Sequence, residues 1–345
     1  MLKKILNVVK VGSNVDYRTN ESFAFPSCMT SLMQYLGEDY LIDEYVYENK
    51  TYINRWANQI FMAVTGMAFG LLWSKDMSLS SLDLTFVNPH DLTIKYAFDW
   101  AGYNYLIIDR DDNYQYLKSE ITNAIDQNHP VLAFGIVGPP ECSLITGYDN
   151  FGEILIGWSH FQERESLPKE SNGMFRKANW FDNLWKVVLI KDKTARRTSI
   201  KEVFRRAIQI MEEKESYDYI SGINVYDYWI SYCLNPEIIM LNEAALKQRY
   251  EYHYLLVNTL QEARLKASDY LKMINEKNRS EILFKCAKYF DEIYNICKEL
   301  LHVFTDYQEF RKDDKRKICA RFLLRIKMLE IKALEELKVF DGEMS

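Results

Sequence analysis

Cys28 stands where a cysteine can be activated as a nucleophile. It follows Pro26 and Ser27, and it opens an amphipathic stretch that continues to Leu36 and stops at Gly37. The thiolate is the reactive form of cysteine, and the unpaired N–H groups and dipole of a helix N-terminus lower the thiol pKa. We therefore expect a helix over 28–36, capped by Ser27, with Cys28 as a candidate nucleophile. The alternative is a small buried core residue, which is what most free cysteines are.

A second informative segment spans residues 129–158. Its short apolar runs are separated by turn residues, which predicts strands over 131–137, 143–148 and 154–158. The tetrapeptide at 149–152, Asp-Asn-Phe-Gly, has the residues of a hairpin turn between the last two strands.

Together the two segments resemble a known superfamily. FPSCMTSLMQYLG at 25–37 and HPVLAFGIVGPPECSLITGYDNFGEILIGW at 129–158 are similar to the papain-like superfamily, above all to double-glycine leader peptidases and butirosin-biosynthesis-type acyltransferases. NQIFMAVTGMAFGLLW at 58–73 resembles a segment that follows the nucleophile helix in the butirosin-type group. The resemblance covers roughly residues 15–195 and implies an α+β papain-like domain with an antiparallel sheet.

The resemblance also assigns positions in a catalytic site. Cys28 matches the nucleophile, but Cys142 stands where the histidine base is expected. The orienting Asp or Asn falls near Ser159. The oxyanion-hole Gln is replaced by Ser22, with Asn20 and Glu21 as near substitutes.

Two other side chains near these positions are candidates for the missing catalytic groups. His160 could serve as the base from the end of the next strand, and Glu141 could act as an acceptor, although a surface role is the commoner one for both. Cys28 and Cys142 could instead form a regulatory disulfide or bind a soft metal, but two ligands make a metal site a weak proposal. We expect no cofactor and no metal.

Two functions follow as expectations. The first is a thiol-dependent hydrolase or acyltransferase acting on a peptide or acyl-thioester substrate, with Cys28 as nucleophile and His160 as base. The alternative is a catalytically degenerate binding or regulatory module that holds a peptide or acyl small-molecule ligand. The retained cysteine favours the first, and the absent histidine favours the second.

The composition changes near residue 195. All glycines except Gly222 and Gly342, and all prolines except Pro236, lie before it. We therefore expect a mixed α and β domain over 1–195 and an all-α helical bundle over 196–345. The expected elements, besides those above, are helices over 88–102, 114–128, 199–214, 225–233, 237–274, 280–304 and 313–339, and strands over 105–109 and 185–191.

The remaining features limit the partners and the cellular compartment that we expect for the protein. The formal charge of −6 gives no general argument for nucleic acid, and the eight basic residues within 311–327 are expected on a solvated helix face. The apolar run over 60–73 is too short to cross a bilayer, so no membrane partner is expected. Six scattered cysteines without metal-ligand spacing indicate a reducing, cytoplasmic setting. His253 is expected as a core or interface residue, and a homodimer through the helical domain is a further expectation.

Overall fold

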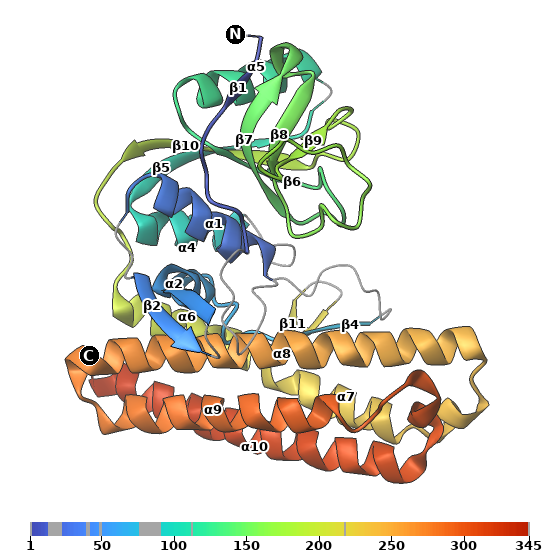
Figure 1. The fold of residues 1–345 in the computed structure, drawn as a ribbon. Helices are drawn as coiled ribbons and strands as arrows, with labels where there is room; N and C mark the ends of the chain where they lie inside the picture. Colours follow the sequence, from blue (N-terminus) through green and yellow to red (C-terminus); the bar gives the residue numbers. More distant parts are fainter. Residues whose placement is uncertain are drawn as a thin grey trace. The chain divides into compact units, whose positions relative to one another are not determined.

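The computed structural model describes residues 2–12, 23–38, 42–47, 50–75, 91–111, 113–216 and 219–343. The chain divides into two compact units, Met1–Phe61 with Ile94–Arg197, and Met62–Thr93 with Thr198–Ser345 (Figure 1). The later boundary falls close to the expected change at residue 195. The segment 62–93, which the sequence analysis placed in the first domain, belongs to the second unit.

An antiparallel sheet forms the centre of the first unit, as expected. Its strand order is β5-β10-β6-β7-β8-β9, and β1 also pairs with β7. β6 pairs with residues 142–145 of β7, whereas β1 pairs with 147–148, so both lie along one edge of that strand. The bounds are β1 (Lys4–Ile5), β5 (Tyr103–Asp109), β6 (Val131–Phe134), β7 (Cys142–Asp149), β8 (Ile154–Trp158), β9 (Phe175–Lys177) and β10 (Lys186–Lys193).

The first unit also contains helices α1 (Ala24–Tyr35) and α5 (Tyr114–Asp126) and a hairpin of β2 (Ile42–Tyr47) and β3 (Lys50–Arg55). α2 (Trp56–Val64) and α4 (Leu92–Ala101) each cross from one unit into the other along the chain. The expected turn after β7 is a short 3₁₀ segment, η2 (Asn150–Gly152), whose residues all have positive φ. Asn and Gly adopt this conformation readily, whereas Phe151 does so at a cost.

The start of α1 corrects the sequence analysis. The helix begins at Ala24, four residues before Cys28, with Phe23 as N-cap and no side-chain cap. Pro26 is therefore inside the first turn, where its missing N–H is one that would have no helical partner in any case. Ser27 already donates its N–H to the carbonyl of Phe23. Cys28 consequently lies beyond the unpaired N–H groups that were expected to activate it.

The second unit is largely helical. Ser199 caps α6 through a reciprocal capping box with Glu202, which confirms the predicted helix start. α8 packs against α9, and α9 packs against α10, with short connections that make neighbouring helices antiparallel (Figure 1). None of the described helices is both long and apolar enough to span a membrane. The bounds are α6 (Ile200–Glu212), α7 (Val225–Leu234), α8 (Glu243–Asn278), α9 (Glu281–Leu301) and α10 (Asp313–Glu343).

The apolar run over 60–73 is buried within the chain. It forms the end of α2, a set of turns and the start of β4 (Leu72–Ser74), which pairs with β12 (Tyr219–Ser221) in a small sheet with β11 (Glu215–Ser216). Ser74 donates its N–H to the Tyr252 hydroxyl of α8 at 2.6 Å. These contacts explain why the segment groups with the helices that follow it by more than a hundred residues.

A buried ion pair fastens the same segment to the bundle. Arg264 of α8 donates through Nε to Glu330 of α10 at 2.5 Å, and both side chains are at most 2% exposed. The Nη1 of Arg264 donates to the carbonyls of Ala68 and Gly70 at 2.8 and 3.1 Å. The hydroxyl of Tyr226 on α7 donates to the same Glu330 oxygen at 3.0 Å. One carboxylate and one guanidinium therefore join three helices and the 62–71 segment.

Neutralising Glu330 should destabilise the protein strongly. Glu330→Gln leaves the Arg264 charge buried without its counter-ion, and we expect a loss of about 3–5 kcal/mol in the free energy of unfolding. The measurement is urea denaturation followed by circular dichroism. Glu292→Gln is the matched control, because it removes the carboxylate of an exposed pair with Arg325 on α10 and should cost about 0–1 kcal/mol. Equal effects of the two substitutions would contradict a structural role for the buried pair.

Candidate functional site

Cys28 and Cys142 lie against each other where α1 packs on β7. The Sγ of Cys28 donates to the backbone carbonyl oxygen of Cys142 at 3.6 Å. Both residues are buried, at 0% and 1% exposed, and neither forms a disulfide. The rings of Phe25 and Phe134 meet beside them at 6.0 Å. The helix and the strand thus form a packed contact at the place where the resemblance puts a catalytic cleft.

The surroundings of the two thiols bear on the candidate role of Cys28 as a nucleophile. A catalytic cysteine needs a base within hydrogen-bond reach and a path for the substrate. Among the described residues, the hydrogen bond of the Cys28 thiol goes to a carbonyl oxygen, which accepts a proton no more readily than any amide. The Cys142 thiol, which replaces the expected imidazole, points to the carbonyl of Ser143 at 3.8 Å. Among the described residues, no hydrogen bond joins the Cys28 sulfur to an imidazole or a carboxylate.

His160, the candidate base, lies against the N-terminal segment. A Cβ atom on Gly12 would be 2.4 Å from its Cε1, so the Gly12 backbone, with φ +65°, lies directly against the imidazole. Its Nε2 is buried without a hydrogen-bond partner among the described residues. Burial, together with the charge of Lys10, lowers the pKa of His160 to about 4. An imidazole held neutral in this way is a weak base, and no described hydrogen bond joins it to Cys28.

The other candidates take structural positions. Ser159 accepts the N–H of Phe161 through its hydroxyl, and its own N–H donates to Gln162, so it stabilises the turn after β8. The backbone of Glu141 closes the turn between β6 and β7 by accepting the N–H of Gly135. Asn20 and Ser22, the candidate oxyanion residues, lie outside the described residues.

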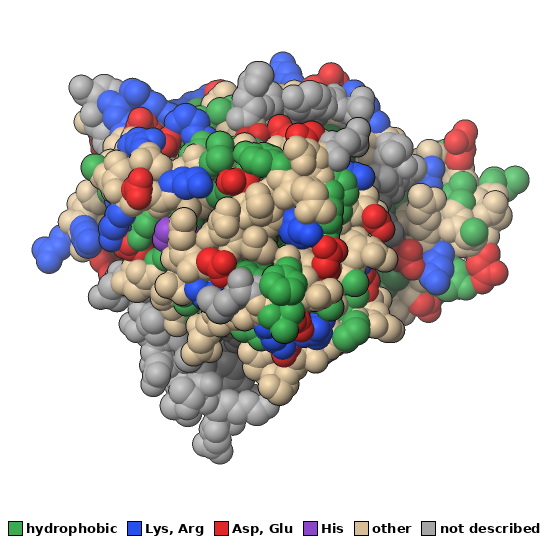
Figure 2. Space-filling model, turned by 90° about the horizontal axis from the view of Figure 1, so that it is seen from above, with side chains coloured by type: hydrophobic (Ala, Val, Ile, Leu, Met, Phe, Trp, Pro, Cys, Tyr) green, Lys and Arg blue, Asp and Glu red, His purple; other side chains and the backbone are tan. Residues whose placement is uncertain are grey.

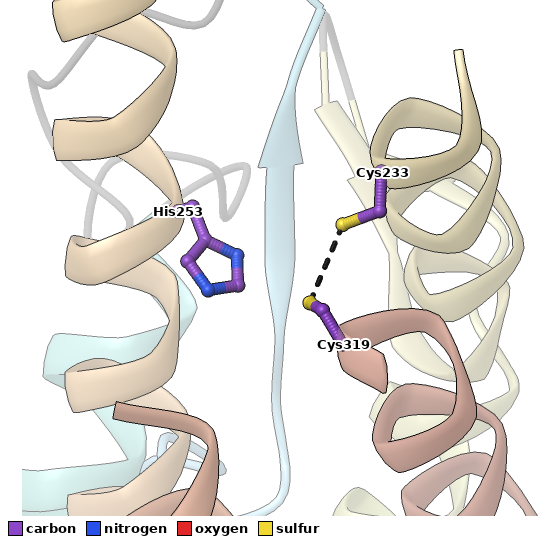
Figure 3. A group of neighbouring side chains, drawn as sticks. All are labelled: Cys233, His253 and Cys319. Carbon is purple, nitrogen blue, oxygen red and sulfur yellow. Dashed lines mark hydrogen bonds between the residues drawn. The ribbon is translucent and has the colours of Figure 1, made fainter. Parts of the chain in front are cut away.

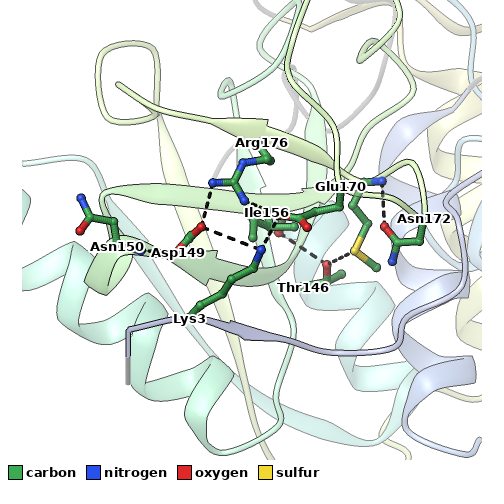
Figure 4. Close-up of polar contacts among 9 residues, drawn as sticks. Lys3, Thr146, Asp149, Asn150, Ile156, Glu170, Asn172 and Arg176 are labelled. Atoms are coloured by element: carbon green, nitrogen blue, oxygen red, sulfur yellow. Dashed lines mark hydrogen bonds and ion pairs between the residues drawn. The ribbon is translucent and has the colours of Figure 1, made fainter.

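A charged network at the end of β7 joins three parts of the first unit (Figure 4). Arg176 of β9 donates to Asp149 at 2.8 Å and also pairs with Glu170. Lys3 donates to Glu170 at 2.9 Å. The hydrogen bond from Arg176, and a second from the backbone of Asn150, lower the pKa of Asp149 against the small opposing effect of burial. The Asp of the GYD motif therefore ties the chain start and the edge strand to β7.

An open cavity of about 450 Å³ lies beside this network. Its apolar wall is formed by Ile154, Leu167 and Pro168. Its polar wall includes two side-chain amides and three charged residues, Arg176, Lys177 and Asp182. The amides belong to Asn179 and Asn183, which are exposed and whose side chains make no hydrogen bond to other described residues. The cavity therefore combines an apolar surface with charged groups and with amides that can donate and accept hydrogen bonds.

One group of side chains with metal-ligand chemistry was not predicted from the sequence. Cys233, His253 and Cys319 lie together in the second unit (Figure 3). The two cysteines are 86 positions apart along the chain, a separation that resembles no short metal motif. The signals that were available are a histidine in an apolar helix stripe and two cysteines on helices predicted to pack together.

The basic run over 311–327 is balanced by acidic partners. Lys315 and Lys312 pair with Glu309, and Lys327 pairs with Asp227. These pairings favour the expectation of a solvated helix face over a nucleic-acid surface. Figure 2 views the molecule from above Figure 1, and both basic and acidic side chains are present on the face that it shows.

Comparison with known protein families and with curated proteins found no match. The papain-like resemblance therefore rests on the motifs in the sequence.

The burial of His160 should make stability depend on pH. Its pKa of about 4 in the folded state lies below about 6.5 in the unfolded chain, so the unfolded state binds more protons between these values. The free energy of unfolding should therefore fall as the pH drops from 6.5 to 4. His160→Gln should flatten this slope, whereas His302→Gln, which removes an exposed imidazole, is the control. Urea denaturation across this pH range measures both, and an unchanged slope in His160→Gln would refute the assignment.

Proposed function

We propose that the first unit is a ligand-binding or regulatory module on a papain-like scaffold, without thiol catalysis. One observation carries the proposal: the Cys28 thiol is fully buried and donates to the carbonyl of Cys142, the residue that stands in place of the histidine base. A hydrolase or acyltransferase would need that sulfur open to an acyl group and paired with a base.

The cavity between β8 and the loops that flank β9 is the ligand site of this proposal. Its amides at Asn179 and Asn183 can donate to and accept from peptide groups, and its apolar wall can cover a short aliphatic chain. Lys177 is paired with Glu165 at 2.7 Å and Arg176 with Asp149 at 2.8 Å, while Asp182 adds a carboxylate to the lining. A peptide or an acylated small molecule without a large net charge fits this lining.

A thiol enzyme remains the competing function, and the placement of α1 against the first residue of β7 supports it. The same pairing of helix and strand brings nucleophile and base together in the resembling enzymes. The two functions differ in whether Cys28 can be reached by an electrophile in the folded protein. The homodimer expected through the helical domain stays a prediction.

Alkylation of Cys28 separates the two functions. We expect iodoacetamide to modify Cys28 at least ~100-fold more slowly in the folded protein than in urea, because the sulfur reacts only after local opening. Residue-resolved mass spectrometry over a time course gives both rates, and the buried Cys297 of the helical unit is the internal reference. Rapid labelling of Cys28 alone, slowed in His160→Gln, would instead establish an activated nucleophile.

Binding of acylated peptides tests the cavity. We expect members of a panel of N-acyl dipeptides with short acyl chains to bind, and Asn183→Ala to weaken that binding by roughly 3- to 10-fold, the effect of one hydrogen bond. Isothermal titration calorimetry supplies the affinities. Asn123→Ala, an exposed asparagine on α5 outside the cavity, should leave them unchanged. Absence of binding across the panel, or equal loss in both variants, would exclude the cavity as the site.

A further inference from the structure

Two thiols and an imidazole meet in the core of the helical unit. Cys233 comes from α7, His253 from α8 and Cys319 from α10 (Figure 3). All three are buried, at 0%, 3% and 0% exposed. The two sulfurs are 3.5 Å apart, and the three potential ligand atoms all lie within 4.8 Å of one another.

The spacing of the sulfurs fits a common metal ion. Zinc–sulfur bonds of about 2.3 Å place two thiolates about 3.8 Å apart in a tetrahedral site and about 4.0 Å apart in a planar trigonal one. The observed 3.5 Å is only a few tenths of an ångström shorter. Side chains held this close by three different helices need little movement to share one ion.

The contacts of His253 show which interactions a bound metal ion would have to replace. The indole N–H of Trp229 donates to Nδ1 at 3.0 Å, so this nitrogen carries a lone pair and no proton. The rings of Phe304 and Phe310 lie 5.4 and 5.6 Å from the imidazole. Nε2 is buried and has no hydrogen-bond partner among the described residues. A buried polar atom left in this state costs free energy that a ligand can recover.

We propose that Cys233, His253 and Cys319 bind one soft metal ion, Cu⁺ or Zn²⁺, that joins α7, α8 and α10. Thiolate and imidazole are the donors that these ions prefer. Three donors in a site closed to water satisfy Cu⁺, whereas Zn²⁺ needs a fourth ligand to reach its tetrahedral geometry. Each thiol releases its proton when the ion binds.

Trp229 competes with the ion whichever nitrogen coordinates. Coordination through Nδ1 takes the lone pair that now accepts the indole N–H. Coordination through Nε2 moves the ring proton to Nδ1, where it faces the same N–H. Removing this donor should therefore strengthen metal binding, which is the reverse of what a purely structural contact predicts.

The test uses the full chain, purified without metal under anaerobic, reducing conditions. It is titrated separately with Cu⁺ and with Zn²⁺ against a competing chelator, and bound metal is measured by mass spectrometry after gel filtration. We expect one equivalent of at least one ion, lost in Cys233→Ser and in Cys319→Ser. Cys286→Ser and Cys297→Ser, two other buried cysteines of the same unit, should retain it. Trp229→Phe should bind roughly 2- to 10-fold more tightly, since one hydrogen bond no longer opposes the ion.

X-ray absorption of the loaded wild-type protein keeps the proposal testable if a variant fails to fold. A shell of two sulfurs and one nitrogen at about 2.3 and 2.0 Å is expected. An oxygen-only shell would overturn the proposal, as would no bound equivalent of either ion or the same stoichiometry in Cys319→Ser. A disulfide between Cys233 and Cys319 in air, with neither ion bound under reduction, would also overturn it and assign the pair to redox chemistry.

Discussion

The buried pair of Arg264 and Glu330 is the constraint on which the helical unit depends. Taking both charges out of water is expensive, and their attraction offsets this only if the remaining donors and acceptors also find partners. Arg264 meets part of that condition by donating to the carbonyls of Ala68 and Gly70, and Oε1 of Glu330 accepts from Tyr226. Oε2 of Glu330 is buried without a hydrogen-bond partner among the described residues. The hydrogen bonds of the pair form together only when three helices and a distant apolar segment are all in place. This requirement favours one arrangement of the unit over other compact packings.

The first unit depends on a different contact. α1 packs against β7, and the buried residues of α1 form a continuous run that begins at Ala24. A cysteine at position 142 fits this packing, because a thiol is small and needs no strong hydrogen-bond partner in the core. A histidine there would need a partner for each ring nitrogen. Cys142 therefore suits the tight packing of α1 on β7.

Local patterns predicted the elements well and the long-range relations poorly. The strand over 154–158, the cap at Ser199 and the end of α7 before Pro236 are set by neighbouring residues, and the structure has them where they were expected. The strand expected over 131–137 ends at Phe134. The predicted start of α1 at Cys28 is wrong, because Pro26 indicates a position before the helix only if the first helical turn excludes proline. The first turn accepts proline, and α1 begins at Ala24. The segment that begins at Met62 groups with the helical unit, and Arg264, almost 200 residues later, donates to its carbonyls at Ala68 and Gly70. No short stretch of the sequence indicates this contact. The proximity of Cys233, His253 and Cys319 is likewise not indicated by any short stretch.

The burial of all six cysteines limits what sulfur can do in this chain. An enzyme that attacks an acyl group must admit carbon atoms to within bonding distance of the thiolate, which requires an open cleft. A metal ion has no such requirement, since it enters as a single atom and is covered by its ligands. Buried thiols are therefore compatible with coordination while they exclude most covalent catalysis. The proposed metal site in the helical core is therefore compatible with buried sulfur, whereas the proposed ligand site uses no thiol.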